Sequence, residues 1–322
     1  MTQVPSSTDT PLEQAPLGVL LMAYGTPRQV DEVEAYYTHI RHGHPPTKEL
    51  LDDLLRRYQA IGGLSPLNAI TEAEAHGLET ALNADGGRPV RVYLGMKHTH
   101  PFIGDTVRQM SADGITEAVT LVLAPHYSTR SVAEYQRAAS DAAQATGKPT
   151  LYHVDFWYDN EKFLQLIANR VRSRLTEFSN SDDVMVVFSA HSLPEKILAA
   201  GDPYQDQLHA TGNAVAEALN LKHYMFAWQS AGRTADKWLG PDILDVLRDL
   251  AATGRKNVLL CPVGFVSDHL EVLYDVDIEA QALAHDLGIK LARTENLNAD
   301  LAFIEVLRDV VRSRETAAET GR

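Results

Sequence analysis

Short apolar stretches alternate with longer amphipathic stretches along almost the whole chain. The apolar stretches are rich in Val, Leu and Ile and do not alternate strictly with polar residues, which is typical of parallel strands covered on both faces. They lie at residues 17–23, 90–94, 118–124, 151–154, 184–188, 224–228, 258–262 and 289–292. Helical periodicity occupies segments between them, at residues 48–61, 70–83, 132–146, 161–178 and 242–253. This succession predicts an α/β fold with parallel sheets.

The two halves of the chain repeat the same features. A strand ending at residues 22–25 opens the first half, and a strand ending at residues 188–191 opens the second. Each half also contains a strand that runs into a proline, Pro125 in the first and Pro262 in the second. Eight strands could form one long sheet or two shorter ones, and the repetition favours two four-stranded sheets with a cleft between them.

We place the boundary between the halves near residue 150, which gives one domain over residues 17–150 and another over residues 151–322. The segment before them, residues 1–16, contains three prolines and no apolar core. It fits no signal peptide, so we interpret it as a disordered leader.

Composition and charge exclude several classes of protein. The chain has 322 residues, with 29 Lys and Arg against 43 Asp and Glu, which gives a formal net charge of −14. Such an acidic chain is a poor general binder of nucleic acid or of an anionic membrane. No apolar run approaches the roughly 18 residues that a membrane-spanning helix needs. The single cysteine, Cys261, can form no internal disulfide, which suits a reducing, cytoplasmic environment.

A histidine and a series of carboxylates are the strongest candidates for chemistry. His191 follows a buried strand, at the edge where open parallel sheets place their ligands. Glu271, Asp275 and Glu279 recur every four residues, so a helix would stack them on one face. This spacing also fits a solvated acidic face, although its flanks are apolar. At a cleft, His191 and Glu271 would offer iron a nitrogen and an oxygen ligand, and the other carboxylates would form a route for cations or protons.

Other arrangements are weaker. Ser189 and Ser192 flank the histidine, but the nucleophile elbow of a hydrolase is absent, and so is a dinucleotide-binding glycine motif. The H-x-H pairs at residues 42–44 and 98–100 are more typical of surface loops than of metal ligands. Arg41, Arg56, Arg57 and Tyr58 could hold anionic groups of a ligand, or lie on exposed helix surfaces.

Seven short motifs, taken together and in order, resemble the ferrochelatase family. They are Met22–Pro27, Tyr36–Arg41, Arg57–Pro66, Leu123–His126, Ser189–Glu195, Trp238–Pro241 and Pro262–Glu271. The resemblance runs from about residue 17 to the end and is closest to the coproporphyrin III ferrochelatases of Gram-positive bacteria. It implies two Rossmann-like halves of the class II chelatase type, with a porphyrin in the cleft between them. It also implies that the protein inserts Fe²⁺ into the porphyrin, which releases two protons.

The resemblance also implies roles for individual residues. His191 corresponds to the family's active-site histidine, a metal ligand or proton acceptor, and Glu271 to its partner carboxylate. Asp275 and Glu279 correspond to an outer acidic route, and Tyr24 to a tyrosine that can contact the iron from the opposite face. The family's contacts to the carboxylates of the substrate correspond to Arg41, Arg57, Tyr58, Ser65 and Tyr135. Lys97 and His98 correspond to a Lys-His pair near the cleft, whose role is less settled.

Substrate and partners are further expectations from the resemblance. The stretch Arg41–Leu64 is polar and partly basic, which favours coproporphyrin III with its four carboxylates over protoporphyrin IX with two. A non-catalytic haem carrier and a cobalt chelatase are the alternatives. Some relatives carry an iron–sulfur cluster on cysteines, but one cysteine supplies too few ligands, so we expect no cluster and no resident cofactor. We also expect a monomer, because the chain ends soon after its last helix, and a transient contact with the coprohaem decarboxylase.

Overall fold

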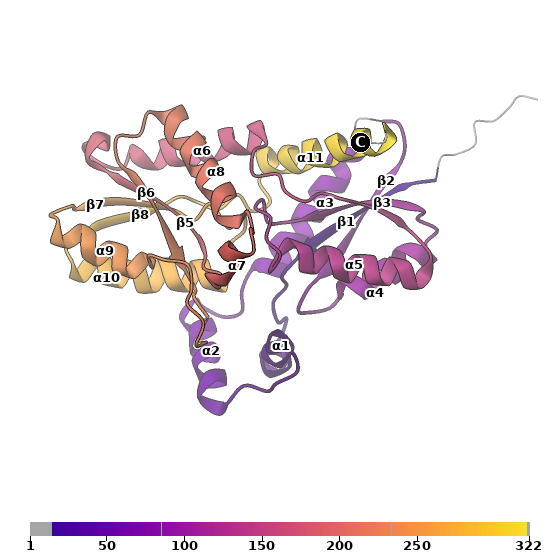
Figure 1. Cartoon of the computed structure of the whole chain (residues 1–322), viewed down its shortest axis with the longest axis horizontal. Helices are drawn as coiled ribbons and strands as arrows, with labels where there is room; N and C mark the ends of the chain where they lie inside the picture. Colours follow the sequence, from indigo (N-terminus) through magenta and orange to yellow (C-terminus); the bar gives the residue numbers. More distant parts are fainter. Residues whose placement is uncertain (1–14, 85, 233, 321–322) are drawn as a thin grey trace, which may run out of the picture.

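The eight predicted strands form two separate four-stranded parallel sheets, and the chain does not form one long sheet (Figure 1). The computed structural model describes residues 15–84, 86–232 and 234–320. The first sheet has the order β2-β1-β3-β4, with β1 Leu17–Ala23, β2 Val90–Met96, β3 Glu117–Val122 and β4 Thr150–His153. The second has the matching order β6-β5-β7-β8, with β5 Met185–His191, β6 Tyr224–Gln229, β7 Asn257–Cys261 and β8 Lys290–Arg293. Most of the predicted leader lies outside the described residues.

The boundary between the halves differs from the predicted position. A boundary near residue 150 would assign β4 to the second half, but β4 pairs with β3 of the first sheet. Thr150 lies opposite Glu117, and His153 lies opposite Thr120. The first sheet therefore extends to His153, and the second begins only at Met185.

Helices cover both faces of each sheet. They are α1 Val33–Ile40, α2 Lys48–Ala60, α3 Leu67–Ala84, α4 Ile103–Ala112, α5 Val132–Thr146, α6 Glu161–Leu175, α7 Lys196–Ala199, α8 Tyr204–Leu219, α9 Ile243–Ala252, α10 Gln281–Asp286 and α11 Leu301–Glu319. Short 3₁₀ helices occupy Val30–Glu32 (η1) and Ser181–Asp183 (η2), and a π-helix occupies Val272–Ala280 (η3). In Figure 1, α1 and α2 project from the first half below the space between the sheets. The last helix, α11, lies along α3 of the first half.

One hydrophobic core joins the two halves. Leu78 on α3, Phe163 on α6 and Phe188 on β5 belong to a single buried cluster, which also includes Phe303 and Leu307 of α11. Burying apolar surface is the main favourable contribution to folding. Because α11 contributes to a core shared with the first half, the C-terminal helix packs on the first half and stabilises the contact between the two halves.

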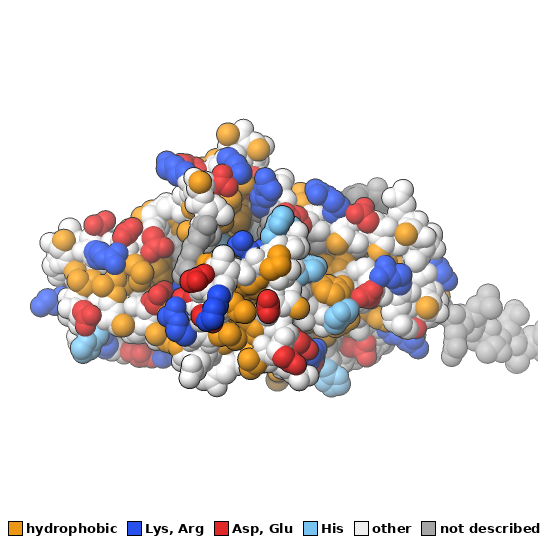
Figure 2. Space-filling model, turned by 90° about the horizontal axis from the view of Figure 1, so that it is seen from below, with side chains coloured by type: hydrophobic (Ala, Val, Ile, Leu, Met, Phe, Trp, Pro, Cys, Tyr) orange, Lys and Arg blue, Asp and Glu red, His pale blue; other side chains and the backbone are white. Residues whose placement is uncertain are grey.

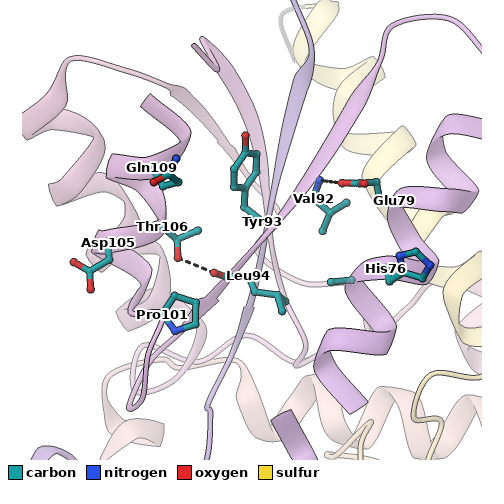
Figure 3. Close-up of a pocket in the computed structure, with 10 residues that line it drawn as sticks. His76, Glu79, Val92, Tyr93, Leu94, Pro101, Asp105, Thr106 and Gln109 are labelled. Atoms are coloured by element: carbon teal, nitrogen blue, oxygen red, sulfur yellow. Dashed lines mark hydrogen bonds between the residues drawn. The ribbon is translucent and has the colours of Figure 1, made fainter. Parts of the chain in front are cut away.

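The outer edge of the first sheet is closed by side chains. Figure 3 shows Glu79 accepting a hydrogen bond from the Val92 backbone N–H, at 2.7 Å, and Thr106 donating one to the Leu94 carbonyl, also at 2.7 Å. An unpaired strand edge is a template for pairing with another chain, and these bonds occupy part of it. The pocket drawn there lies along the edge strand β2, outside the space between the sheets.

Polar side chains also tie the halves together. Buried Asp202, ahead of α8, accepts hydrogen bonds from Ser128 Oγ at 3.0 Å and from the Thr129 backbone N–H at 2.7 Å. Elsewhere, buried Glu74 of α3 accepts a hydrogen bond at 2.6 Å from Ser267, which belongs to the second half. Burial raises the pKa of Glu74 to about 7, although the Ser267 hydrogen bond opposes this.

The raised pKa of Glu74 predicts a pH-dependent stability. Between about pH 4.5 and 7 the folded protein keeps a proton that the unfolded chain releases, so this contribution to stability is lost as the pH rises through that range. In Glu74→Gln this dependence is absent. The unfolding free energy of the variant relative to the wild type should therefore rise by about 2 kcal/mol from pH 5 to pH 8. Denaturant unfolding at both pH values measures it, and an equal difference at both would contradict the assigned pKa.

Candidate active site

His191 and Glu271 face each other from two elements of the second half. His191 is the last residue of β5, and Glu271 immediately precedes the π-helix η3. Their Nε2 and Oε1 atoms lie 3.5 Å apart, and the side chains are 33% and 37% exposed. The Ser192 carbonyl accepts a hydrogen bond from His191 Nδ1, which fixes the proton there and turns Nε2 toward the carboxylate. The structure therefore brings together the two residues with the strongest claim to chemistry.

Each member of this pair stabilises the charged form of the other. Burial lowers the pKa of His191, but the Glu271 carboxylate outweighs it and raises the pKa to about 9. Burial raises the pKa of Glu271, but the positive charge of His191 holds it below its usual range. At neutral pH the pair is an imidazolium and a carboxylate that share one proton. His191 must release that proton before its Nε2 lone pair can meet a metal ion.

A second histidine, absent from the sequence predictions, touches the same carboxylate. His269 Nε2 lies 3.6 Å from Glu271 Oε2, and its Nδ1 lies 3.1 Å from the Ser267 carbonyl oxygen. Its ring also packs on Phe265, with 4.7 Å between the ring centroids. The H-x-E spacing of these two residues was the available sequence signal.

Asp275 and Glu279 lie on the π-helix that Glu271 immediately precedes, and not on the α-helix that the spacing suggested. Hydrogen bonds from residue i to i+5 widen the turn, and residues four apart still follow one another along nearly the same side. Asp275 is buried, and burial together with the charge of Glu271 raises its pKa to about 6. Ser230 donates a hydrogen bond to Asp275, and the charge of Glu279 also acts on it. The three carboxylates thus form a connected line leading from His191.

Arg57 takes a different position from the one expected of a ligand clamp. Its guanidinium Nη1 lies 3.2 Å from Asp275 Oδ1, and its Nε lies 3.3 Å from Asp53 Oδ2. The guanidinium carbon also lies 4.6 Å from the centre of the Tyr274 ring, a cation–π distance. Arg57 therefore joins α2 of the first half to the acidic line of the second, and this guanidinium is already engaged by carboxylates.

The first half contributes an aromatic face. Tyr24 follows β1, is 41% exposed, and stacks near His98 with 4.4 Å between the ring centroids. Partial burial raises the pKa of Tyr24 above its ordinary value, and the charge of Glu271 from the second half adds to the effect. Tyr58 is buried, with its hydroxyl 3.2 Å from Thr26 Oγ1, and burial raises its pKa to about 12.

The other predicted residues surround this face. Tyr135 and Ser65 are buried, and Lys97 lies 5.1 Å over the Tyr135 ring while its Nζ pairs with Glu134 at 2.7 Å. His98 is buried too, and burial lowers its pKa to about 3, so its imidazole is neutral at neutral pH. Its Nδ1 lies 2.9 Å from Nδ1 of His39, another residue that the sequence reasoning did not single out.

The last predicted residue lies on the lobe formed by α1 and α2, which projects from the first half (Figure 1). Arg41 lies directly after α1, where its Nε donates a hydrogen bond to the His44 carbonyl at 3.2 Å. On the face seen in Figure 2, basic, acidic and histidine side chains are interspersed around the middle of the molecule. Positive charge is thus locally available although the net charge of the chain is −14.

The two halves contribute different groups to the candidate site. The second half contributes His191 and Glu271, a nitrogen and an oxygen donor for a metal ion, and the first half contributes Tyr24. Across the described ranges, no three His, Cys, Asp or Glu side chains gather closely enough to enclose an ion. Two protein donors fill only part of the coordination shell of a metal ion, so its other ligands must come from a bound substrate or from water.

Comparison with known proteins decides the family. The ferrochelatase family model matches residues 16–315. The chain belongs to the ferrochelatase family. Coproporphyrin III ferrochelatase 2 of Bacillus cereus is 46% identical over 302 residues, which cover 93% of this chain and 95% of that protein. The coproporphyrin III ferrochelatase of Geobacillus thermodenitrificans is 50% identical over 303 residues, which cover 92% and 96%.

Solved structures support the fold of this ferrochelatase family member. The sirohydrochlorin chelatase SirB of Bacillus subtilis matches 95% of this chain and 98% of its own, with a TM-score of 0.59 and 11% identity. CbiX matches 92% and 98%, with a TM-score of 0.53 and 12% identity. Both likenesses concern the fold, that of the class II chelatases. No helix of the described residues is long and apolar enough to cross a membrane.

Proposed function

We propose that this chain inserts Fe²⁺ into coproporphyrin III, forming Fe-coproporphyrin III (coprohaem) in haem biosynthesis. The His191–Glu271 pair supports this proposal, because it offers a metal ion a nitrogen and an oxygen donor, and the charge of Glu271 acts on Tyr24 of the first half. The family and the names of the similar bacterial proteins agree with it. The enzyme is a porphyrin metal chelatase, with Fe²⁺ as a substrate.

Insertion must balance one metal ion against two protons. Two pyrrole N–H bonds break, the nitrogens bind Fe²⁺, and both protons leave. A protein that holds the macrocycle bent exposes the nitrogen lone pairs, which brings the substrate part-way to the transition state. Incoming Fe²⁺ repels the proton that lies between His191 and Glu271. When this proton leaves, the imidazole is free to bind the metal or to receive a pyrrole proton. Glu271, Asp275 and Glu279 then offer a line of oxygens along which protons or hydrated iron pass.

The polar and basic side chains of the lobe formed by α1 and α2 favour the porphyrin with four carboxylates. Arg41 and Arg56 lie on the segment that projects near the site, and charged side chains are frequent on that face (Figure 2). The experiment is anaerobic competition between coproporphyrin III and protoporphyrin IX for the same enzyme. A ratio of kcat/KM of at least about tenfold in favour of coproporphyrin supports the proposal. The reverse preference would keep the enzyme and change the substrate.

The structural position of Arg57 predicts an effect on iron and not on porphyrin. In Arg57→Ala, Asp275 loses its positive partner, so its pKa should rise above about 6 and the acidic line should hold cations less well. We expect KM for Fe²⁺ to increase about fivefold while KM for coproporphyrin III changes less than twofold. Arg248→Ala is the matched control, since Arg248 is 54% exposed on α9 and forms its ion pair with Asp245 of the same helix. An increase in KM for porphyrin alone would restore Arg57 as a carboxylate clamp.

The same proposal extends to cofactor, assembly and location. The one cysteine, Cys261, is buried in β7, where burial raises the pKa of its thiol to about 12, so we propose that no iron–sulfur cluster or other resident cofactor is used. We also propose that the enzyme works as a monomer. We place the enzyme in the cytoplasm, with a transient contact to the coprohaem decarboxylase that consumes its product.

A further inference from the structure

One buried carboxylate remains unused by the site described above. Glu74 of α3 is 0% exposed, and its Oε1 accepts a hydrogen bond from Ser267 Oγ at 2.6 Å. Its Oε2 is buried without a hydrogen-bond partner among the described residues. Burying a carboxyl group costs free energy unless hydrogen bonds replace those it made to water, and here only one of the two oxygens has such a bond among the described residues. The contact crosses from the first half to the second, between residues 193 positions apart.

Ser267 belongs to the loop that leads to the active site. Its backbone carbonyl accepts a hydrogen bond from His269 Nδ1 at 3.1 Å, so His269 carries its proton on that nitrogen. The other ring nitrogen, Nε2, then faces Glu271 Oε2 at 3.6 Å. A continuous series of contacts therefore runs from Glu74 through Ser267 and His269 to the carboxylate that pairs with His191.

The loop is held from its other side as well. The Asn298 side chain accepts a hydrogen bond from the Asp268 backbone N–H at 2.8 Å, and the Val266 carbonyl accepts one from the Leu297 backbone N–H at 2.9 Å. Both bonds come from the second half itself. Glu74, by contrast, contacts this loop from the first half, which also carries Tyr24.

We propose that Glu74 is a positioning residue for Glu271, setting the distance between the catalytic pair and the opposite face of the site through Ser267 and His269. This inference rests on the proposed function. Glu74 reaches no substrate, so its effect is on the geometry of the His191–Glu271 pair. The porphyrin carboxylates are held elsewhere, which means that loss of the contact should lower kcat and leave KM for the porphyrin unchanged.

The test uses four variants of the full chain: Ser267→Ala, Glu74→Ala, their double variant, and Glu74→Gln. Ser267→Ala removes the tether but keeps the carbonyl that binds His269. We expect about a tenfold loss of kcat in each Ala variant and no further loss in the double variant, because both remove one interaction. Glu74→Gln retains an acceptor for Ser267 and should restore kcat to within about twofold of the wild type. Glu72→Ala, an exposed carboxylate on the same helix, is the control.

A spectroscopic measurement separates positioning from general stability. Nitrogen NMR of ¹⁵N-histidine-labelled protein reports which ring nitrogen of His269 carries the proton, and Ser267→Ala should weaken the Nδ1–H preference seen in the wild type. If Glu74→Ala does not fold, Ser267→Ala and Glu74→Gln still decide the matter. Variants with lowered melting temperature but unchanged kcat and His269 signals would overturn the proposal. A wild type that inserts no metal would instead overturn the proposed function.

Discussion

Replacement of His191 by Ala is expected to lower the rate of Fe²⁺ insertion about 10³-fold while the protein stays folded. The imidazole is the nitrogen donor of the pair, and the second histidine, His269, lies against the other carboxylate oxygen, Oε2. Folding should survive because the side chain is one-third exposed and makes one hydrogen bond, to the Ser192 carbonyl. Initial rates with coproporphyrin III, and a thermal unfolding curve, measure the two parts of the expectation.

The matched control for this variant is His285→Ala. His285 is 89% exposed at the end of α10, so its loss should leave the rate unchanged. A His191→Ala variant that retains full activity would remove His191 from the mechanism.

Replacement of Glu271 by Gln is expected to have the second-largest effect. The amide keeps the size of the side chain but removes the charge that raises the pKa of His191 to about 9. Burial then lowers the pKa of His191 against the weaker opposing effects of the Ser192 carbonyl and the Asp275 charge, so the pKa should fall well below about 9. We expect about a 10²-fold loss of kcat, because the pair loses both its proton acceptor and the negative charge that attracts the metal ion.

Two measurements check the Glu271→Gln expectation: the insertion rate, and an NMR titration of the His191 ring. Asp286→Asn is the control, since Asp286 is 79% exposed at the end of α10. An unchanged titration of His191 would mean that its raised pKa has another origin, even if the rate falls.

Local patterns predicted most of the fold. Strand β1 and helix α5 occupy the expected ranges, and α2 and α6 begin where expected because Thr47 and Asn160 cap their first turns. Such features depend on residues close together in the sequence. The boundary of the first half was wrong because β4 is short, and only its pairing with β3 shows where it belongs.

The candidate site was less predictable where it depends on contacts across the chain. Carboxylates four residues apart fit an α-helix and a π-helix equally well, so the spacing could not distinguish them. The ion pair of Arg57 joins residues 218 positions apart, and no local pattern indicates it. The contacts of Glu74 with Ser267 and of His269 with Glu271 likewise become visible only once α3 packs on the loop before η3.

The most direct test is anaerobic incubation of the wild-type chain with Fe²⁺ and coproporphyrin III, followed by absorbance and mass spectrometry of the product. The account predicts many turnovers per enzyme, with each porphyrin gaining one iron and losing two hydrogens. Porphyrin that binds tightly but takes up iron no faster than it does without protein would contradict the account and would instead fit a carrier.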